Sequence, residues 1–307
     1  MKRRNKFLAL ILAAAVSCSF TACGSEDSNK GSVQQEAGSQ GEDTSDEGSE
    51  EKTAEDVLTQ AQEKMKDVKS MAAKMVMHMD MKMSAEGEEQ TMQMVSNADM
   101  SCLYDPVRMK IDMDIDMGEL GSTKQNIYAE AAEDGTITEY IGDGTNWQKV
   151  NIQLEDLGQY DAAKNMQNYL DSSFNFKLDG TEQVDGADAY KLSGVMTGEK
   201  IKEAMVASGA LNYLTSLGMD ASQTDTMLDG LGDIPLTFWI DAESSYPVKY
   251  DIDMSAVMNT LMSKMMESMD EQAQGMSIEI PKMTMEMTCS DYNEVEEFTI
   301  PEDAKKA

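Results

Sequence analysis

Along much of the chain, apolar residues occupy every second position, and methionine supplies most of them. The alternation runs through residues 71–83, 92–102 and 107–117, where polar or charged residues take most of the intervening positions. A period of two is typical of strands that bury one face and expose the other, as in an antiparallel sheet. Turn residues at 86–87 and 105–106 separate these runs, so the sequence predicts a meander of strands.

Shorter runs of the same kind continue towards the C-terminus. The sequence predicts further strands at residues 125–131, 137–142, 146–152, 190–196, 234–242, 248–254 and 283–289. Asp143 and Gly144 are a hairpin turn signal between two of them. Because proline has no N–H to donate to a ladder, Pro281 is expected at the start of the last strand.

Helical spacing of apolar residues also occurs. Thr53 begins a capping box, with Asp56 three residues later, and the apolar residues that follow predict a helix over 54–69. Further helices are predicted over residues 153–171, in broken segments of 199–230, and over 255–272. This order of elements predicts an α+β fold, in which a curved antiparallel sheet (a half-barrel) carries helices on its concave side.

Residues 1–22 have the organisation of an export signal. Basic residues precede an apolar run at 7–16, which is shorter than the roughly 20 residues of a transmembrane helix. The signal ends in the sequence FTAC at 20–23, which resembles the lipobox of bacterial lipoproteins. That resemblance implies that Cys23 becomes the lipidated N-terminus with a diacylglycerol anchor. A weaker second lipobox lies at 15–18, and an ordinary cleaved secretory signal is the plain alternative.

The stretch after this cysteine is rich in Ser, Gly, Gln and acidic residues, with Val33 and Ala37 as its apolar residues. It buries too little apolar surface to offset the entropy of ordering, so a disordered tether is predicted. The predicted domains are a signal peptide at 1–22, lipidated cysteine and acidic tether at 23–52, and a folded domain at 53–307. The protein is therefore expected on the extracytoplasmic face of the cell membrane, held by its lipid.

The chain is strongly acidic, with a formal net charge of −32. Such a charge disfavours nucleic acids and anionic lipid headgroups, and leaves apolar ligands and other envelope proteins as candidate partners. An enzyme is not indicated. The single histidine, His78, falls on the polar face of a strand, and the sequence has no glycine-rich phosphate loop, nucleophile elbow or zinc-ligand spacing. No cofactor and no metal site are predicted.

Two cysteines remain in the folded domain after the signal is removed and Cys23 is lipidated. Cys102 and Cys289 both fall on the apolar face of predicted strands. They are either buried free thiols or a disulfide, depending on whether their strands are neighbours.

Three aspartates, Asp112, Asp114 and Asp116, have the spacing that opens a calcium loop. The glycine falls at Gly118, however, and the twelfth position is Thr123 instead of glutamate, so the motif departs from an EF-hand. The sequence favours the other interpretation, in which these carboxylates form the polar face of a strand.

Methionine is the unusual component, with 29 in the chain. Sixteen of them fall on the predicted apolar strand faces: Met71, Met75, Met77, Met79, Met81, Met83, Met92, Met94, Met100, Met109, Met113, Met117, Met254, Met283, Met285 and Met287. In one interpretation they replace leucine and valine in an ordinary core. In a second they line an adaptable cavity, because thioether chains are flexible and polarizable. In a third they capture Cu(I), which soft thioethers select.

The run MVMHMDMKM at 75–83 invites the copper interpretation. Methionines two positions apart on one strand are separated by about 6.6 Å, and His78 faces away from them. A copper site would therefore need a methionine from a neighbouring strand, such as Met92 or Met94.

Three motifs carry a family resemblance. Residues 140–149 (YIGDGTNWQK) and 238–249 (FWIDAESSYPVK) resemble recurrent hairpins of LolA/LppX-like bacterial lipoproteins. Residues 184–194 (VDGADAYKLSG) resemble the strand that usually lies between these hairpins, so the order also matches. The resemblance implies a half-barrel whose concave face can hold an acyl chain or another apolar ligand. The motifs themselves are turn and packing chemistry and imply no catalysis.

The preferred hypothesis is a lipoprotein that binds a lipid or other apolar molecule in a cavity lined by methionines. The predicted ligand-binding residues are Met75, Met77, Met79, Met81, Met92, Met94, Met109, Met113, Met283, Met285 and Met287. One alternative is a structural or interaction lipoprotein without a small ligand, whose acidic surface docks another envelope protein. The other alternative is a Cu(I)-binding protein.

Overall fold

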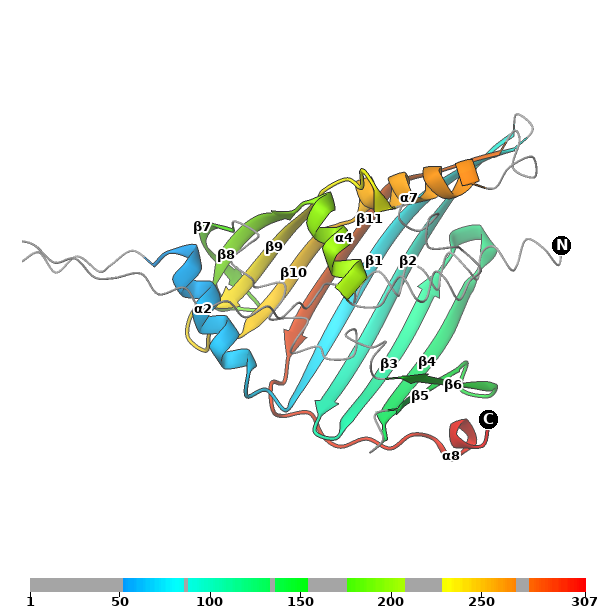
Figure 1. The fold of residues 1–307 in the computed structure, drawn as a ribbon. Coiled ribbons are helices and arrows are strands. Elements are labelled where there is room, and N and C mark those ends of the chain that lie inside the picture. The colour runs from blue at the N-terminus through cyan, green and yellow to red at the C-terminus, as the bar shows by residue number, and fades with distance from the viewer. Residues whose placement is uncertain (1–51, 86–87, 133–135, 154–175, 208–227, 269–275) are drawn as a thin grey trace, which may run out of the picture.

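Eleven strands form one open, wholly antiparallel sheet in the order β6-β5-β4-β3-β2-β1-β11-β10-β9-β8-β7 (Figure 1). The structure, a computed structural model, describes residues 52–85, 88–132, 136–153, 176–207, 228–268 and 276–307. The predicted signal peptide, Cys23 and nearly all of the tether lie outside the described residues. The predicted α+β class, a large curved antiparallel sheet with helices, is confirmed.

The strands are β1 (Ser70–Ala85), β2 (Glu88–Tyr104), β3 (Val107–Asp116), β4 (Ser122–Ala131), β5 (Thr136–Gly142), β6 (Trp147–Gln153), β7 (Lys177–Val184), β8 (Ala187–Met196), β9 (Ile234–Asp241), β10 (Pro247–Asp253) and β11 (Met276–Ser290). The helices are α2 (Ala54–Met65), α4 (Gly198–Ala207), α7 (Ser255–Ser268) and the short α8 (Glu302–Lys305), with a 3₁₀ turn at Gly118–Leu120.

The first and last strands pair at the centre of the sheet. Strands β1 to β6 form one meander and β7 to β11 form another, and the β1–β11 ladder joins them. This ladder runs from Ala72 opposite Ser290 to Ala85 opposite Met276. The same strand β1 pairs with β2 along its whole length, so it is the most extensively bonded strand of the sheet.

Helices α2, α4 and α7 lie against one face of the sheet (Figure 1), and we call this face concave. Their buried residues, including Leu58, Ile201 and Met258, belong to the same core cluster as the strand methionines. Helix α2 begins with the predicted capping box, in which the Thr53 hydroxyl accepts a hydrogen bond from the backbone N–H of Asp56. The short α8 differs from the prediction, because its Ala304 packs with Tyr140 in a separate small cluster.

Most predicted elements are present. The predicted helix at 54–69 is α2, and the one at 255–272 contains α7. Helix α4 begins one residue before the predicted helical region 199–230. The predicted helix at 153–171 lies outside the described residues, except for its first residue, which ends β6. Strand β7 was not predicted, because its sequence KLDGTEQV is polar and most of it is exposed at the sheet edge.

The prediction that Pro281 starts the last strand is wrong, because β11 begins at Met276 and extends through this proline. The β1–β11 register shifts there: Lys82 is opposite Glu279, whereas Asp80 is opposite Lys282. A bulge of this kind leaves a position where no ladder donor is required, and proline is tolerated at such positions. The bulge therefore explains how a proline lies inside the β1–β11 ladder, which we call the seam of the sheet.

Helix α7 satisfies backbone groups of β11 around this bulge. The side-chain oxygen Oδ1 of Asn259 accepts a hydrogen bond from the backbone N–H of Ile280 at 2.9 Å. The hydroxyl of Ser255 accepts one from the N–H of Met283 at 2.8 Å. The β10–β11 ladder extends only to Asp253 opposite Thr284. Side chains of α7 thus accept hydrogen bonds from the part of β11 that is not paired with β10.

We expect the substitution Asn259→Ala to lower the free energy of unfolding by about 1–3 kcal/mol, because it leaves a half-buried backbone N–H without its acceptor. Urea denaturation followed by circular dichroism measures this change. Thr260→Ala is the matched control, since that hydroxyl bonds to the carbonyl of Ala256 in its own helix and its loss should cost no more than about 0.5 kcal/mol. Equal losses in both variants would contradict the role given to Asn259.

Candidate functional site

The eleven predicted ligand-binding methionines all lie on the concave side of four neighbouring strands. We call them the methionine face: Met75, Met77, Met79, Met81, Met92, Met94, Met109, Met113, Met283, Met285 and Met287. Nine of them are buried, and Met109 and Met287 are partly buried against the same core cluster. The five other methionines predicted on strand faces also belong to this cluster. The alternation of the sequence therefore identified the buried side of each strand correctly.

The strand register brings these methionines into rows across the sheet. At the β1–β11 seam, Met75 is opposite Met287, Met77 is opposite Met285, and Met79 is opposite Met283. Directly opposed residues of an antiparallel pair have Cβ atoms about 4.5–5.5 Å apart, so each pair is in side-chain contact. The seam of the sheet thus carries three directly opposed pairs of methionines.

Strand β2 extends two of these rows on the other side of β1. Met94 is opposite Met79, and Met92 is opposite Met81. Met79 therefore stands between two methionines, Met94 and Met283, in a single row over three strands. The sequence predicted that a thioether cluster would need a partner from a neighbouring strand, and the register supplies one.

A serine interrupts the methionine face. Ser96 occupies the concave side of β2, opposite Met77 on β1 and Ile115 on β3, and only 1 % of its surface is exposed. Its hydroxyl oxygen is buried and has no hydrogen-bond partner in the structure described. Sequence analysis missed this residue. The signal was present, since Ser96 is the polar member of an otherwise apolar alternating series.

A second polar group on the concave side is the carboxyl of Glu139. It is opposite Ala129 on β4, which is itself opposite Met109 on β3, so all three lie in one row. Burial raises the pKa of Glu139 to about 7, and no nearby cation offsets this effect among the described residues. Near neutral pH this carboxyl is therefore divided between its neutral and charged forms. The sequence gave no reason to single it out among so many acidic residues.

The two cysteines are free thiols. Strand β1 separates them, because Cys102 on β2 is opposite Met71 and Cys289 on β11 is opposite Ala73. Burial raises the pKa of each thiol to about 12. Of the two alternatives left open by the sequence, free thiols are therefore confirmed, with Cys289 buried and Cys102 partly buried. Neither residue is poised as a nucleophile.

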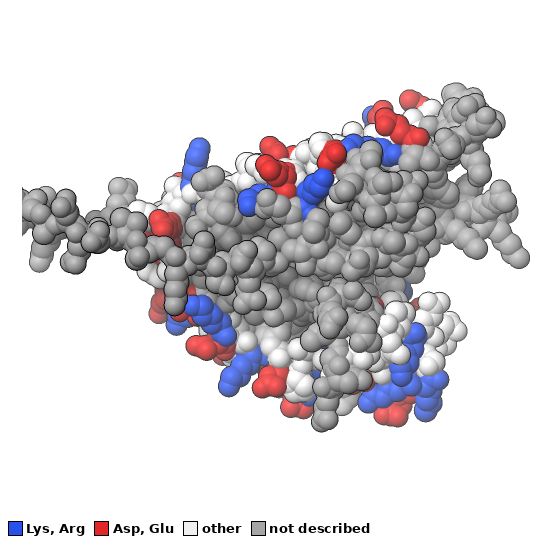
Figure 2. Space-filling model, viewed as in Figure 1, with Lys and Arg blue, Asp and Glu red and all other residues white. Residues whose placement is uncertain are grey.

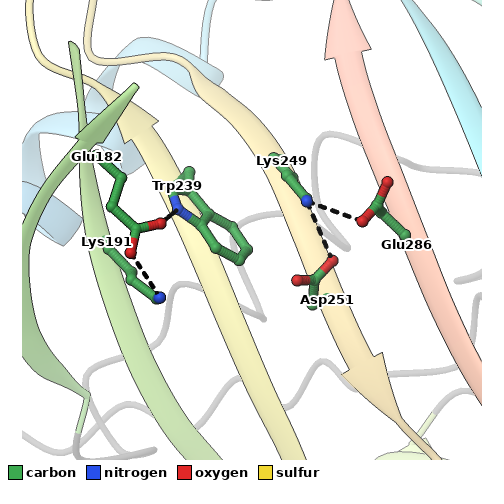
Figure 3. Close-up of polar contacts among 6 residues, drawn as sticks. All are labelled: Glu182, Lys191, Trp239, Lys249, Asp251 and Glu286. Carbon is green, nitrogen blue, oxygen red and sulfur yellow. Dashed lines mark hydrogen bonds and ion pairs between the residues drawn. The ribbon is translucent and has the colours of Figure 1, made fainter. Parts of the chain in front are cut away.

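The opposite face of the sheet is charged, and one group of its charges is paired. The carboxylate of Glu182 accepts a hydrogen bond from Trp239 Nε1 at 2.9 Å and contacts Lys191 Nζ at 2.8 Å (Figure 3). Lys249 Nζ contacts Glu286 at 2.8 Å and lies 4.9 Å from the centre of the Trp239 ring. The hydrogen bond from Lys191 is the largest of the effects that lower the pKa of Glu182. The cluster thus links several strands of the sheet through ion pairs and a hydrogen bond on its polar face.

The aspartates considered for calcium also lie on this polar face. Asp112 contacts Lys110 Nζ at 2.7 Å, and Asp114 contacts Lys124 Nζ at 2.9 Å. Asp116 accepts a hydrogen bond from the backbone N–H of Gly118. Within the described part of the chain, no group of three or more histidine, cysteine or acidic side chains could hold a metal ion. Their interpretation as the polar face of a strand is thus confirmed.

The surface seen in Figure 2 carries basic and acidic side chains next to one another along its margins, without a large patch of one sign among the described residues. His78 is exposed, as expected for the polar face of β1. None of the helices among the described residues is long and apolar enough to cross a membrane.

The open antiparallel sheet with helices packed on one face has the architecture of LolA/LppX-like proteins. The described architecture thus agrees with the fold that the resemblance of the three motifs implied. The chain belongs to DUF6612, described as a family of unknown function, whose profile matches residues 53–307. No curated protein matches the chain significantly.

The chain is similar to several solved structures, of which three follow. LprF from Mycobacterium bovis is 14% identical, with a TM-score of 0.45 over 81% of this chain and 96% of that one. Lipoprotein LppX from Mycobacterium tuberculosis is also 14% identical, with a TM-score of 0.40 over 80% and 97% of the two chains. A LolA superfamily protein from Nitrosomonas europaea is 11% identical, with a TM-score of 0.19 over 81% and 96%. Function is therefore argued from the residues of this chain alone.

The raised pKa of Glu139 makes stability depend on pH in a defined direction. Because the pKa is higher in the folded than in the unfolded state, the free energy of unfolding falls as pH rises from the usual glutamate pKa of 4.5 to about 7, and it levels off above that. We expect Glu139→Gln to raise the free energy of unfolding by about 2 kcal/mol at pH 8.5 and to change it little at pH 4. Urea denaturation at the two pH values measures the difference. Glu89→Gln, at an exposed position of β2, is the control, and the same pH-dependent gain there would refute the assignment.

Proposed function

We propose that this protein is an extracytoplasmic lipoprotein, anchored to the cell membrane through Cys23, that binds a lipid or another apolar molecule against its methionine face. The acidic stretch at 24–52 serves as the tether between the anchor and the sheet. Catalysis has no part in the proposal, since burial keeps the concave thiols protonated.

The observation that carries the proposal is the choice of methionine for a continuous buried surface. Ordering a methionine side chain costs about 1.5–2 kcal/mol of conformational entropy, against about 0.5–1 kcal/mol for leucine or isoleucine. A rigid core is therefore built at lower cost from branched side chains. Methionine is favoured where a surface must change its shape, because its unbranched thioether adapts to different neighbours.

The position of the methionine face fits such a role. It lies at the centre of the sheet, on the side where α2, α4 and α7 pack (Figure 1). An acyl chain placed there would meet apolar side chains from four strands in register. Burial of the chain against these side chains would stabilise the complex by about 25 cal/mol for each Å² of apolar surface removed from water.

The test is native mass spectrometry and organic extraction of the purified protein, and we expect a lipid or other apolar molecule in about equimolar amount. The triple substitution M77L/M79L/M285L keeps the side-chain volume but stiffens the seam, so we expect unchanged or higher stability and several-fold less bound lipid. The pair M65L/M262L, on helices α2 and α7, is the matched control and should retain the lipid.

A protein that carries no organic ligand would contradict the proposal. Co-purification of another envelope protein that is released at high salt would then favour the interaction role, because exposed charge pairs are screened by salt.

The row Met94–Met79–Met283 favours Cu(I) binding as a second candidate function, since it aligns three thioethers on adjacent strands. If this row holds Cu(I), M79L should weaken binding of Cu(I), or of its redox-stable analogue Ag(I), at least tenfold in a competition titration with a chelator. M113L is the control, because Met113 is opposite Ala98 and Gln125 and lacks a methionine directly across either ladder. Equal affinity in the wild type, M79L and M113L would exclude a site centred on Met79.

A further inference from the structure

Ser96 is a polar group at the centre of an apolar surface. On its own strand the neighbouring concave positions are Met94 and Ala98, and across the ladders it faces Met77 and Ile115. All four of these side chains are buried. The hydroxyl therefore points into surroundings that offer sulfur and carbon but no strong hydrogen-bond partner from the facing strands.

The hydroxyl has no partner that explains its presence. Strand β2 lies inside the sheet, with ladders to β1 and β3 on both sides of Ser96, so the backbone groups nearby are engaged in the sheet. Its Oγ makes no hydrogen bond in the structure described. Alanine would fill the same space without this cost, as Ala98 and Ala73 do on the same face. A buried hydroxyl without a partner destabilises a fold, and native proteins contain few such groups.

We propose that the Ser96 hydroxyl binds the polar group of the apolar ligand, and that this group is neutral. The inference rests on the proposed function and specifies its ligand class. The ligand is a chain-like apolar molecule with an uncharged hydrogen-bonding group, such as an ester carbonyl or an alcohol, that reaches the middle of β2. A hydroxyl can donate to a carbonyl or accept from another hydroxyl, so it serves either chemistry.

The described strand positions around Ser96 disfavour a charged group at this depth. The concave positions of residues 71–83 on β1, 92–102 on β2 and 107–116 on β3 contain no lysine, arginine or acidic side chain among the residues described. A carboxylate or ammonium group bound beside Ser96 would lose its hydration without gaining a counter-charge, and the cost of this is much larger than one hydrogen bond returns. A free fatty-acid carboxylate would therefore have to lie elsewhere, and an esterified or alcohol group fits.

The test compares two probes that share a chain and differ in hydrogen bonding, 1-dodecanol and 1-chlorododecane. Their dissociation constants are measured by displacement of a fluorescent apolar dye from the purified wild-type protein, Ser96→Ala and Ser101→Ala. Ser101 lies on the same strand but on the other face, opposite Lys110, so it is the matched control. We expect Ser96→Ala to weaken dodecanol binding about three- to tenfold and to leave chlorododecane binding unchanged, with Ser101→Ala like the wild type.

The stability of the ligand-free protein provides a second measurement, which should change in the opposite direction to the dodecanol affinity. Because Ser96→Ala removes an unsatisfied buried hydroxyl, we expect the melting temperature of the ligand-free protein to rise by about 2–4 °C while dodecanol affinity falls. A residue with a purely structural role would lower stability when it is replaced.

The outcomes separate the two proposals. If dodecanol binds the wild type and Ser96→Ala equally well, the polar contact is refuted while the proposed function stands. If neither probe displaces the dye from the wild type, both proposals are contradicted. If Ser96→Ala loses both probes equally, Ser96 shapes the site without binding the polar group, and the inference is again overturned.

Discussion

The structure depends on the ladder between its first and last strands. Strand β1 follows the first helix of the domain and β11 lies close to its end, yet the two pair over most of their length and unite two meanders in a single sheet. Without this ladder, each meander would have an extra unpaired edge at a long strand. Because residues about 200 positions apart must meet before the ladder gains any stability, the seam is a high-contact-order feature. Its long runs of matched apolar positions make that closure favourable.

The same ladder determines which side chains form the centre of the concave surface. Helix α2 leads into β1, and α7 precedes β11, so the chain brings a helix to each seam strand by a short local connection. Asn259 and Ser255 then fix α7 to the backbone of β11 around the bulge. The site and the element that completes the fold are therefore made of the same residues, and a ligand bound at the methionine face would act on the seam itself.

The period of two was sufficient to predict the strands, their buried faces and the class of the fold, because burial on one side of a pleated strand dictates that pattern. Strand β7 escaped prediction because an exposed edge strand needs no apolar face. The place of Pro281 inside β11 depends on a bulge, which is a property of two strands together. Likewise, the row Met94–Met79–Met283 is defined by register, which the sequence of a single strand does not contain. Ser96 was visible as an interruption of the pattern, but its significance depends on the absence of a partner in three dimensions.

Ser96 and Glu139 bear on whether the concave surface is simply a hydrophobic core. Each places a polar group where an apolar one would give a more stable protein, since the hydroxyl has no partner among the described residues and burial raises the pKa of the carboxyl. Both effects oppose folding in the ligand-free state, and methionine adds a further entropic cost along the same surface. A bound molecule with a complementary polar group would give the Ser96 hydroxyl a hydrogen-bond partner. Its apolar chain would be accommodated by the flexible methionine side chains. Features that lower the stability of the ligand-free protein would thus contribute favourable free energy to binding of such a ligand. This is the physical argument for a binding surface over a closed core.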